Sequence, residues 1–387
     1  MYRKSNPNPE WTLDPALPGR CYTTDAFFAE ERAGIFTSEW LCVGRADEIP
    51  NSGDYLLLDA VGERVIITRT RQGELSAFYD VCRHRGCELA LGLSPKPQSA
   101  DAPGASGTFP GVIRCSYHSW TYELDGRLRS APYLNDKIDK GQFALHPVAV
   151  DSWGGFLFIN LTPERAAATP LADQHSAGFG YCQGYPLAEL RAAHRISYDV
   201  QANWKVIVEN YNECYHCAGV HPELCEVIPA FKQGGGINLD WDNGVPYREG
   251  AHAFTRSGTT ERQPFPDLAH EERTLRKAWL FMPNLMLSMT ADHAAAFTLW
   301  PQGPNHTRVV CDFLFHPAQM AQLDFDPADA IEFWDLINRQ DWVVCAGVQR
   351  GMGSRAYRQG YFAPMEDMSQ DTRRYLTATL GAEAVGS

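Results

Sequence analysis

The residues whose types and spacing most directly predict chemistry are two cysteine–histidine pairs. Cys82 and His84 are separated by one residue, and Cys115 and His118 by two. Thiolate sulfur and imidazole nitrogen are both ligands for transition metals. Each pair follows a strand-like segment at a predicted turn, so two backbone loops could bring the four side chains together. The pattern predicts a metal site with two sulfur and two nitrogen ligands.

Two kinds of metal site take this ligand set. A two-iron Rieske cluster has two Cys on one iron and two His on the other, and the imidazoles raise its potential so that it accepts electrons from ordinary reductases. A structural zinc ion also takes two Cys and two His, and ligand type alone does not separate the two. The spacings favour the Rieske cluster, because zinc sites more often pair Cys with Cys and His with His. Four unrelated core residues would rarely form two such tight pairs.

A second group of potential ligands lies in the segment 203–222. We expect a helix from Trp204 to about Cys217, and on this helix Glu213 and His216, three residues apart, share a face. Buried histidines with ordinary hydrogen bonds are the alternative interpretation for His216 and His221. That alternative is weaker here, because the same chain also carries the predicted redox cluster.

His221 follows His216 by five residues, and an ideal helix would turn it away. Gly219 and Pro222 indicate that the helix distorts or ends here, which could bring His221 back towards His216. Two imidazoles and a distant carboxylate would form the facial triad of a non-haem Fe(II) enzyme. This triad leaves coordination positions open for oxygen.

The carboxylate is expected on a long helix over about Pro327–Arg350. Asp341 lies in the middle of an apolar stripe of this helix. The neighbours on its face are Trp334, Ile337, Val344, Cys345 and Val348. A buried carboxylate is costly unless it is paired or binds a metal. Asp335 falls on the polar flank with Glu332 and Arg339, so Asp341 is the preferred ligand, and a buried ion pair with an arginine is the alternative.

Other potential ligands have weaker signals. The other eight histidines, such as His146, His252 and His306, have no ligand-like neighbour and are interpreted as surface or core residues. Cys214 and Cys217 flank His216, but soft thiolates would be unusual at an iron that activates oxygen. We interpret both as packing residues.

The elements around the cysteine–histidine pairs are mostly strands. A first helix is expected over Ala26–Phe36, capped by Thr24 or Asp25. Strands are expected at Tyr55–Leu58, Val65–Thr68, Leu75–Val81, Ile113–Cys115, Thr121–Leu124 and Phe156–Leu161. The Pro-, Gly- and Ser-rich segment Leu93–Val112 has no periodicity and is predicted to be a loop. Residues 38–162 therefore indicate a small all-β domain.

The second half of the chain mixes helices and strands. Strands are expected at Ala192–Val200, Trp279–Thr290, Ala294–Trp300 and Thr307–Phe315, the last two joined by a turn at Gly303-Pro304-Asn305. Strands with helices before and after them indicate an α+β domain.

Composition restricts the class of protein. The chain of 387 residues suits two domains, and its formal net charge of −13 argues against nucleic acid or an anionic membrane as the main partner. No segment approaches the apolar length of a membrane span or the apolar core of a signal peptide, so a cytoplasmic location is expected. An odd number of cysteines, 11, makes a disulfide framework unexpected.

Together these residues resemble the α subunits of Rieske non-haem iron oxygenases, from the helix near Phe27 to Tyr361. Two further runs are similar to the choline, glycine betaine and carnitine oxygenase branch. They are Glu209-Asn210-Tyr211 to His216-Cys217, and Val348-Gln349-Arg350-Gly351 followed by Ser354-Arg355 and Tyr357-Arg358. In that branch a glutamate, here Glu213, takes the place of the aspartate that usually bridges the two metal centres. A surface glutamate is the alternative for Glu213.

The resemblance implies residue roles and a fold. Cys82, His84, Cys115 and His118 would hold the [2Fe-2S] cluster, and His216, His221 and Asp341 the mononuclear iron. The expected fold is α+β, with an N-terminal all-β Rieske domain (38–162) and a C-terminal helix-grip, START-like catalytic domain (163–387). Residues 1–37 would pack on the catalytic domain. The family forms homotrimers in which electrons cross between subunits. The loop at 93–112 is longer than is usual, and a solvated insertion is favoured over a lid or docking role.

The resemblance also implies a reaction. Electrons from NADH or NADPH would arrive through a separate flavin reductase or ferredoxin, because the chain has no Gly-x-Gly-x-x-Gly fingerprint to bind the nicotinamide itself. O2 would be activated reductively and a C–H bond beside nitrogen oxidised, leading to N-demethylation of an amine or quaternary ammonium compound. Aromatic ring hydroxylation or aromatic O-demethylation is the alternative reaction. A Rieske electron carrier without catalysis is the alternative of another class.

Overall fold

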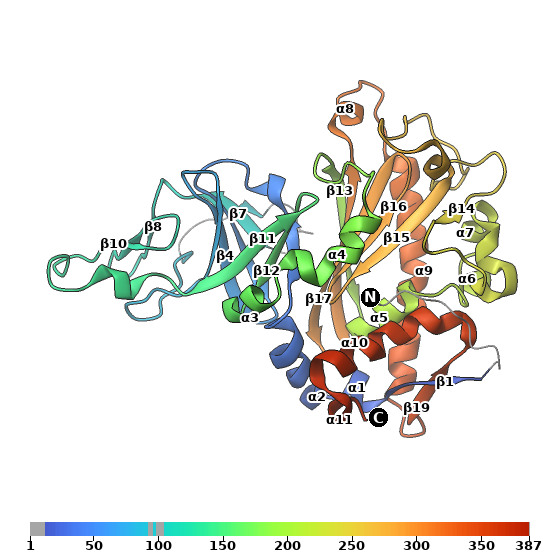
Figure 1. Cartoon of the computed structure of the whole chain (residues 1–387), viewed down its shortest axis with the longest axis horizontal. Coiled ribbons are helices and arrows are strands. Elements are labelled where there is room, and N and C mark those ends of the chain that lie inside the picture. Colours follow the sequence, from blue (N-terminus) through green and yellow to red (C-terminus); the bar gives the residue numbers. More distant parts are fainter. Residues whose placement is uncertain (1–11, 92–95, 98–103, 387) are drawn as a thin grey trace. The chain divides into compact units, whose positions relative to one another are not determined.

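The computed structural model describes residues 12–91, 96–97 and 104–386 (Figure 1). The chain divides into a smaller unit, Phe36–Gln174, and a larger unit, Met1–Ile35 with His175–Ser387. The smaller unit is built mainly of strands, and the larger unit combines a sheet with helices, so the predicted α+β class is confirmed. The predicted domain boundaries, between residues 37 and 38 and between residues 162 and 163, remain predictions.

The smaller unit contains an eight-stranded and a three-stranded antiparallel sheet. The first has the order β2 (Leu41–Arg45), β12 (Phe156–Asn160), β11 (Pro147–Trp153), β5 (Leu75–Tyr79), β4 (Glu63–Arg69), β3 (Asp54–Ala60), β7 (Gly104–Thr108) and β6 (Lys96–Pro97). The second has the order β10 (Leu128–Ser130), β9 (Thr121–Tyr122) and β8 (Ile113–Arg114). The six predicted strands of this region are confirmed with small shifts at their ends, whereas β2, β10 and β11 were not predicted.

The prediction of a loop over Leu93–Val112 is wrong at Lys96–Pro97, which pairs with β7, and at Gly104–Thr108, which pairs with β3. This strand has no apolar alternation and consists of small residues. A side chain at Gly104 would collide with the carbonyl oxygen of Leu57, and one at Gly107 with the ring of Tyr55. The strand therefore forms because its main chain pairs closely with β3, and not because of a side-chain pattern. Residues 92–95 and 98–103 of the predicted insertion lie outside the described residues.

The larger unit is organised around a six-stranded antiparallel sheet. Its order is β13 (Arg191–Val200), β18 (His306–Phe315), β17 (His293–Gly303), β16 (Leu285–Met289), β15 (Leu275–Phe281) and β14 (Val245–Pro246). The prediction of one strand over Trp279–Thr290 is wrong, because the chain turns at 282–284 and Phe281 pairs with Leu285. The predicted turn between β17 and β18 is confirmed.

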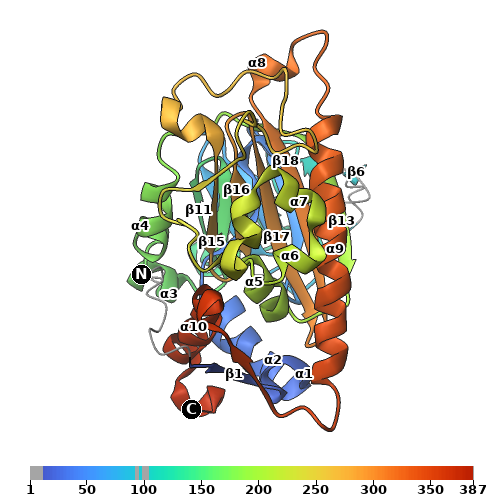
Figure 2. The same ribbon diagram turned by 90° about the vertical axis from the view of Figure 1, so that its right-hand side faces the viewer.

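Helices flank this sheet and connect the elements. The α-helices are α1 (Arg20–Thr23), α2 (Asp25–Glu31), α3 (Pro163–Ala168), α4 (Leu171–Tyr181), α5 (Trp204–Tyr211), α6 (Cys217–Val220), α7 (Pro222–Val227), α8 (Pro317–Met320), α9 (Ala328–Met352), α10 (Gln370–Leu380) and α11 (Ala382–Val385). The long helix α9, which was predicted, runs along the sheet, and α5 lies beside it (Figure 2). Helix α9 carries the candidate ligand Asp341, and α5 leads into the segment that carries His216 and His221.

The N-terminal helix α2 is anchored to α5 by a buried ion pair. Thr24 caps α2 as predicted, accepting a hydrogen bond from the Phe27 amide at 3.3 Å. At the other end of the helix, Glu31 Oε1 accepts hydrogen bonds from Lys205 Nζ at 2.5 Å and Trp204 Nε1 at 3.1 Å. Glu31 and Lys205 are both fully buried. This contact fixes the first turn of α5.

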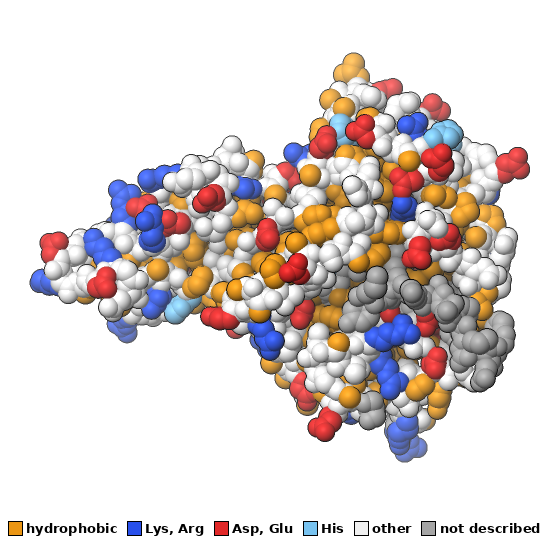
Figure 3. Space-filling view, in the orientation of Figure 1, with side chains coloured by type: hydrophobic (Ala, Val, Ile, Leu, Met, Phe, Trp, Pro, Cys, Tyr) orange, Lys and Arg blue, Asp and Glu red, His pale blue; other side chains and the backbone are white. Residues whose placement is uncertain are grey.

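No helix in the described ranges is long and apolar enough to cross a membrane. On the face drawn in Figure 3, acidic and basic side chains are interspersed with polar and apolar ones. The net negative charge is therefore not collected in one patch on that face.

We expect Glu31→Ala to lower the free energy of unfolding of the protein by about 3–5 kcal/mol, because it leaves the Lys205 ammonium buried without a carboxylate. Urea denaturation of the purified protein measures the loss. The control is Glu30→Ala, a change at the exposed neighbour, which should shift stability by no more than about 0.5 kcal/mol. Equal effects of the two variants would contradict the anchoring role.

Candidate metal centres

The two cysteine–histidine pairs lie in tight turns of the smaller unit. The first turn follows β5 and is closed by a main-chain hydrogen bond from Cys82 N to Cys87 O at 2.9 Å. The second lies between β8 and β9 and is closed by one from Cys115 N to Trp120 O at 2.8 Å. Each turn buries its cysteine and exposes its histidine.

The structure brings the two turns together. The rings of His84 and His118 lie 4.6 Å apart between centroids, at 77° to each other. Burial raises the pKa of the Cys82 thiol, and the adjacent thiol of Cys115 raises it further. Two buried thiols and two exposed imidazoles fit the ligand set of a two-iron cluster, in which the thiolates would hold one iron and the imidazoles the other.

Tyr122 is a further contributor to this site that the sequence analysis missed. Its hydroxyl lies 3.2 Å from Cys82 Sγ and accepts a hydrogen bond from Arg83 N at 3.1 Å. Hydrogen bonds to the sulfurs tune the potential of iron–sulfur clusters. The only sequence signal for Tyr122 is its place on a short strand after the second ligand pair.

The prediction of a helix from Trp204 to Cys217 is wrong at its end, because α5 stops at Tyr211. After it, Glu213 Oε2 accepts hydrogen bonds from the amides of Tyr215 and His216. A side chain that binds nearby main-chain amides competes with helix continuation. Glu213 and His216 are therefore neighbours, as expected, but in a turn and not on a helix face.

The expected distortion near Gly219 and Pro222 is confirmed. Helix α6 ends at Val220, α7 begins at Pro222, and His221 between them has φ −121° and ψ 65°. The non-helical backbone of His221 turns its ring back towards His216, and the two ring centroids lie 5.2 Å apart.

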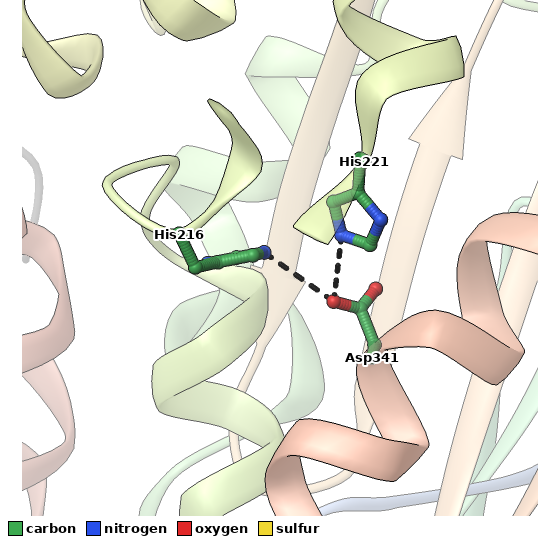
Figure 4. A group of neighbouring side chains, drawn as sticks. All are labelled: His216, His221 and Asp341. Carbon is green, nitrogen blue, oxygen red and sulfur yellow. Dashed lines mark hydrogen bonds and ion pairs between the residues drawn. The ribbon is translucent and has the colours of Figure 1, made fainter. Parts of the chain in front are cut away.

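His216, His221 and Asp341 converge, as Figure 4 shows. Asp341 Oδ1 lies 3.3 Å from His216 Nε2 and 2.8 Å from His221 Nε2. The ligand atoms of the three residues all lie within 4.8 Å of one another. Two imidazole nitrogens and one carboxylate oxygen pointing to one centre fit a non-haem iron site with open positions.

The other ring nitrogen of each histidine is held by an acceptor. Glu213 Oε1 lies 2.5 Å from His216 Nδ1, and Gln340 Oε1 lies 2.7 Å from His221 Nδ1. Gln340 in turn donates a hydrogen bond to Glu223 Oε2 at 3.1 Å. An acceptor at Nδ1 keeps the proton there and leaves the Nε2 lone pair for a metal. Gln340 and Glu223 were missed, although Gln340 directly precedes Asp341.

The charges in this group favour a cation. Burial lowers the pKa of His216, but hydrogen bonds to Asp341 and Glu213 outweigh it and raise the pKa to about 10. Burial raises the pKa of Asp341, and the two histidines more than offset this, so its pKa lies below the usual value. Without a metal the group holds a proton on His216. Metal binding would displace this proton, so affinity for a metal falls as the pH falls.

Asp335, the rejected alternative, is engaged elsewhere. Its carboxylate accepts hydrogen bonds from the Tyr198 hydroxyl at 2.8 Å and from Arg339 Nε at 2.7 Å. On the face of Asp341, Trp334, Ile337 and Cys345 are buried as expected, while Val348 is 46% exposed. The apolar stripe is therefore shorter than predicted.

Cys214 and Cys217 form a disulfide, with their Cα atoms 4.9 Å apart. The expectation that both only pack is wrong for this pair, although a single disulfide is no disulfide framework. The sequence separation of three residues and the turn after α5 bring the two sulfurs together. Neither belongs to the group of His216, His221 and Asp341.

The three converging residues lie in the wall of a pocket. Aromatic side chains form part of its lining, namely Tyr211, Phe231, Trp241, Phe254, Phe297, Trp334 and Trp342. One cationic side chain, Arg276, also lines it.

Two family matches cover most of the chain. The Rieske [2Fe-2S] domain matches residues 39–149, and the ring hydroxylating alpha subunit (catalytic domain) matches residues 187–381. The chain is 32% identical to the glycine betaine monooxygenase oxygenase subunit of Chromohalobacter salexigens, over 90% of this chain and 82% of that protein. It is 30% identical to the carnitine monooxygenase oxygenase subunit of Acinetobacter baumannii, over 92% and 88%. The solved structure of the quaternary ammonium Rieske monooxygenase CntA with an inhibitor has a TM-score of 0.74 at 26% identity, covering 98% of this chain and 99% of that chain.

We expect Asp341→Ala to remove the mononuclear iron and abolish turnover while the cluster absorbance is unchanged, because the carboxylate completes the ligand group. Asp335→Ala is the control on the same helix and should retain the iron. Iron analysis of the two variants beside the unaltered protein measures the difference. Loss of the iron in Asp335→Ala, with retention in Asp341→Ala, would overturn the assignment.

Proposed function

The chain belongs to the Rieske non-haem iron oxygenase α subunits, and we propose that it oxidises an N-methyl group of an amine or quaternary ammonium compound. Membership makes it the terminal oxygenase of a system with a [2Fe-2S] cluster, a mononuclear iron and electrons supplied by a reductase. It is therefore an enzyme, and the alternative of an electron carrier without catalysis is wrong.

One observation carries the proposal: His216, His221 and Asp341 converge in the wall of a pocket that also has aromatic side chains in its lining. Aromatic faces attract quaternary ammonium groups through cation–π interactions. The relatives named above act on glycine betaine and carnitine, and CntA has been solved with L-carnitine and with γ-butyrobetaine. These facts support an N-methylated cation as the substrate.

The reaction consumes one O2, one NAD(P)H and one proton per methyl group oxidised. One oxygen atom enters the C–H bond and the other leaves as water, while two electrons come from the nicotinamide. When bound, the mononuclear iron supplies the site at which O2 is reduced. The resulting hydroxymethyl group on nitrogen loses its O–H proton and leaves as formaldehyde when its C–N bond breaks, and the nitrogen keeps the bonding electron pair and can take up the proton.

Different residues of the chain hold the cluster and position the substrate. We assign the cluster to Cys82 and Cys115 on one iron and to His84 and His118 on the other, with the exposed histidines as the route for electrons. The aromatic walls exclude water and hold the methyl group towards His216, His221 and Asp341.

Electron transfer between subunits of a homotrimer belongs to the same proposal. Glu213 would bridge His216 to His84 or His118 of the partner subunit, and the reductase would be a flavin or ferredoxin-type protein. A carboxylate can accept hydrogen bonds from a ligand histidine on each side, and Glu213 Oε1 already contacts His216 Nδ1.

We expect the purified protein to be brown, to hold three irons per chain and to show, after reduction, the spin-resonance spectrum of mixed His/Cys ligation. With a matched reductase, O2 and an N-methylated substrate it should release formaldehyde and the demethylated amine in equal amounts. Mass spectrometry of the amine separates this outcome from O-demethylation, which also releases formaldehyde. A colourless protein that contains only zinc would refute the iron assignment.

We expect Glu213→Ala to keep both metal centres but nearly to stop reoxidation of the reduced cluster by substrate and oxygen. Single-turnover mixing of pre-reduced protein with O2 measures this rate. Glu213 also accepts hydrogen bonds from two main-chain amides, so Glu213→Gln is needed as a second variant. This change keeps the length of the side chain and an acceptor oxygen but removes the charge. Glu213→Asp should retain part of the rate, because the charge survives and only the reach is lost. Unchanged reoxidation in the Ala variant would rule out the bridge.

A further inference from the structure

Arg276 is a cation in the wall of the pocket that holds the three converging ligands, and the proposed reaction assigns it no role. Strand register explains its direction. Ala278 pairs with Ser288, and Met286 pairs with Phe297. Side chains two residues apart on a strand share a face, so Arg276 lies on the face that carries Ser288, Met286 and Phe297. The next residue, Lys277, points to the other face, where it pairs with Glu272.

The guanidinium is held firmly in this position. Its Nη2 donates a hydrogen bond to Ser288 Oγ at 2.8 Å, and Ser288 Oγ lies 3.0 Å from the Tyr211 hydroxyl. Its Cζ lies 5.9 Å from the ring centroid of Phe231, 5.8 Å from that of Phe254 and 5.7 Å from that of Trp334. Side-chain entropy lost on binding a ligand is therefore small.

One nitrogen of this guanidinium has no hydrogen-bond partner. Arg276 Nε is buried and donates no hydrogen bond, and none of the carboxylates in the described ranges forms an ion pair with Arg276. A buried charge is normally paired and its donors are normally satisfied. The positive charge therefore lacks an anionic partner among the described residues, and the pocket that Arg276 lines is the place where a ligand can supply one.

The same contacts exclude a second cation at this place. The guanidinium already lies over the faces of Phe231, Phe254 and Trp334, so an ammonium group there would meet a like charge. Carboxylate geometry matches the planar guanidinium fork. Trp334 and Asp341 both lie on α9, seven residues apart and thus on the same face, about 10 Å apart along the axis. A small molecule can therefore reach Arg276 with one end and the three converging residues with the other.

We infer that Arg276 anchors a carboxylate of the substrate, which places its N-methyl group at His216, His221 and Asp341. The substrate class is then a zwitterion, an N-methylated amino acid or betaine, and not an amino alcohol such as choline. This inference rests on the proposed function and adds to it the group that orients the molecule. Arg276 is the specificity-determining residue of the pocket.

The test is calorimetric binding to the oxidised holoenzyme without O2, with glycine betaine, L-carnitine and γ-butyrobetaine as carboxylate probes and choline as the probe without a carboxylate. The unaltered protein should bind at least one carboxylate probe at least tenfold more tightly than choline. Arg276→Gln should lose that preference and leave choline binding unchanged, and Arg276→Lys should keep part of it. Lys277→Gln, the loss of a neighbouring cation on the opposite face, should keep it in full.

Three results would overturn the inference: equal binding of choline and all carboxylate probes, no binding of any carboxylate probe, or an equal loss of all probes in Arg276→Gln with normal iron content. Because the first two are measured on the unaltered protein, the test stands even if Arg276→Gln does not fold. Formaldehyde released from choline alone would refute the anchor and leave N-demethylation intact. Tight binding of a carboxylate probe without formaldehyde from any N-methyl compound would refute the proposed reaction and leave the anchor intact.

Discussion

The larger unit depends on one unfavourable placement, a carboxylate on the apolar side of a long helix. Asp341 is tolerated there because two imidazole nitrogens lie within 3.3 Å of a single oxygen atom. Each imidazole is fixed in turn by an acceptor at its other nitrogen, Glu213 or Gln340. Removing a cation or proton from this group would leave negative charge without compensation. The geometry is therefore already arranged for a metal.

The elements around the group keep it in place. Helix α5 leads into the turn that carries Glu213 and His216, and the buried pair of Glu31 and Lys205 ties the start of α5 to α2. Near the other end of α5, Glu209 accepts a hydrogen bond from the Tyr22 hydroxyl at 2.7 Å, and burial raises the pKa of Glu209 to about 8. The N-terminal segment thus supports a site far away in the sequence.

The pocket separates charges of opposite sign along α9. Negative side chains lie at the level of Asp341, and the guanidinium of Arg276 lies against Trp334, two turns earlier. Between them the walls are aromatic. A guanidinium at one end of the pocket can orient a small dipolar molecule before any chemistry begins.

The sequence by itself determined the ligand types, the class of fold and the two family resemblances, because spacing such as that of Cys82 and His84 and the polarity of a long helix are local properties. It also separated Asp341 from Asp335 by helical periodicity alone. Only the tertiary structure decided where α5 ends, that Gly104–Thr108 is a strand, that Gln340 contacts His221, and that Arg276 lines the pocket. These features arise from main-chain pairing and from contacts between residues far apart in the chain, which leave no periodic signal in the sequence.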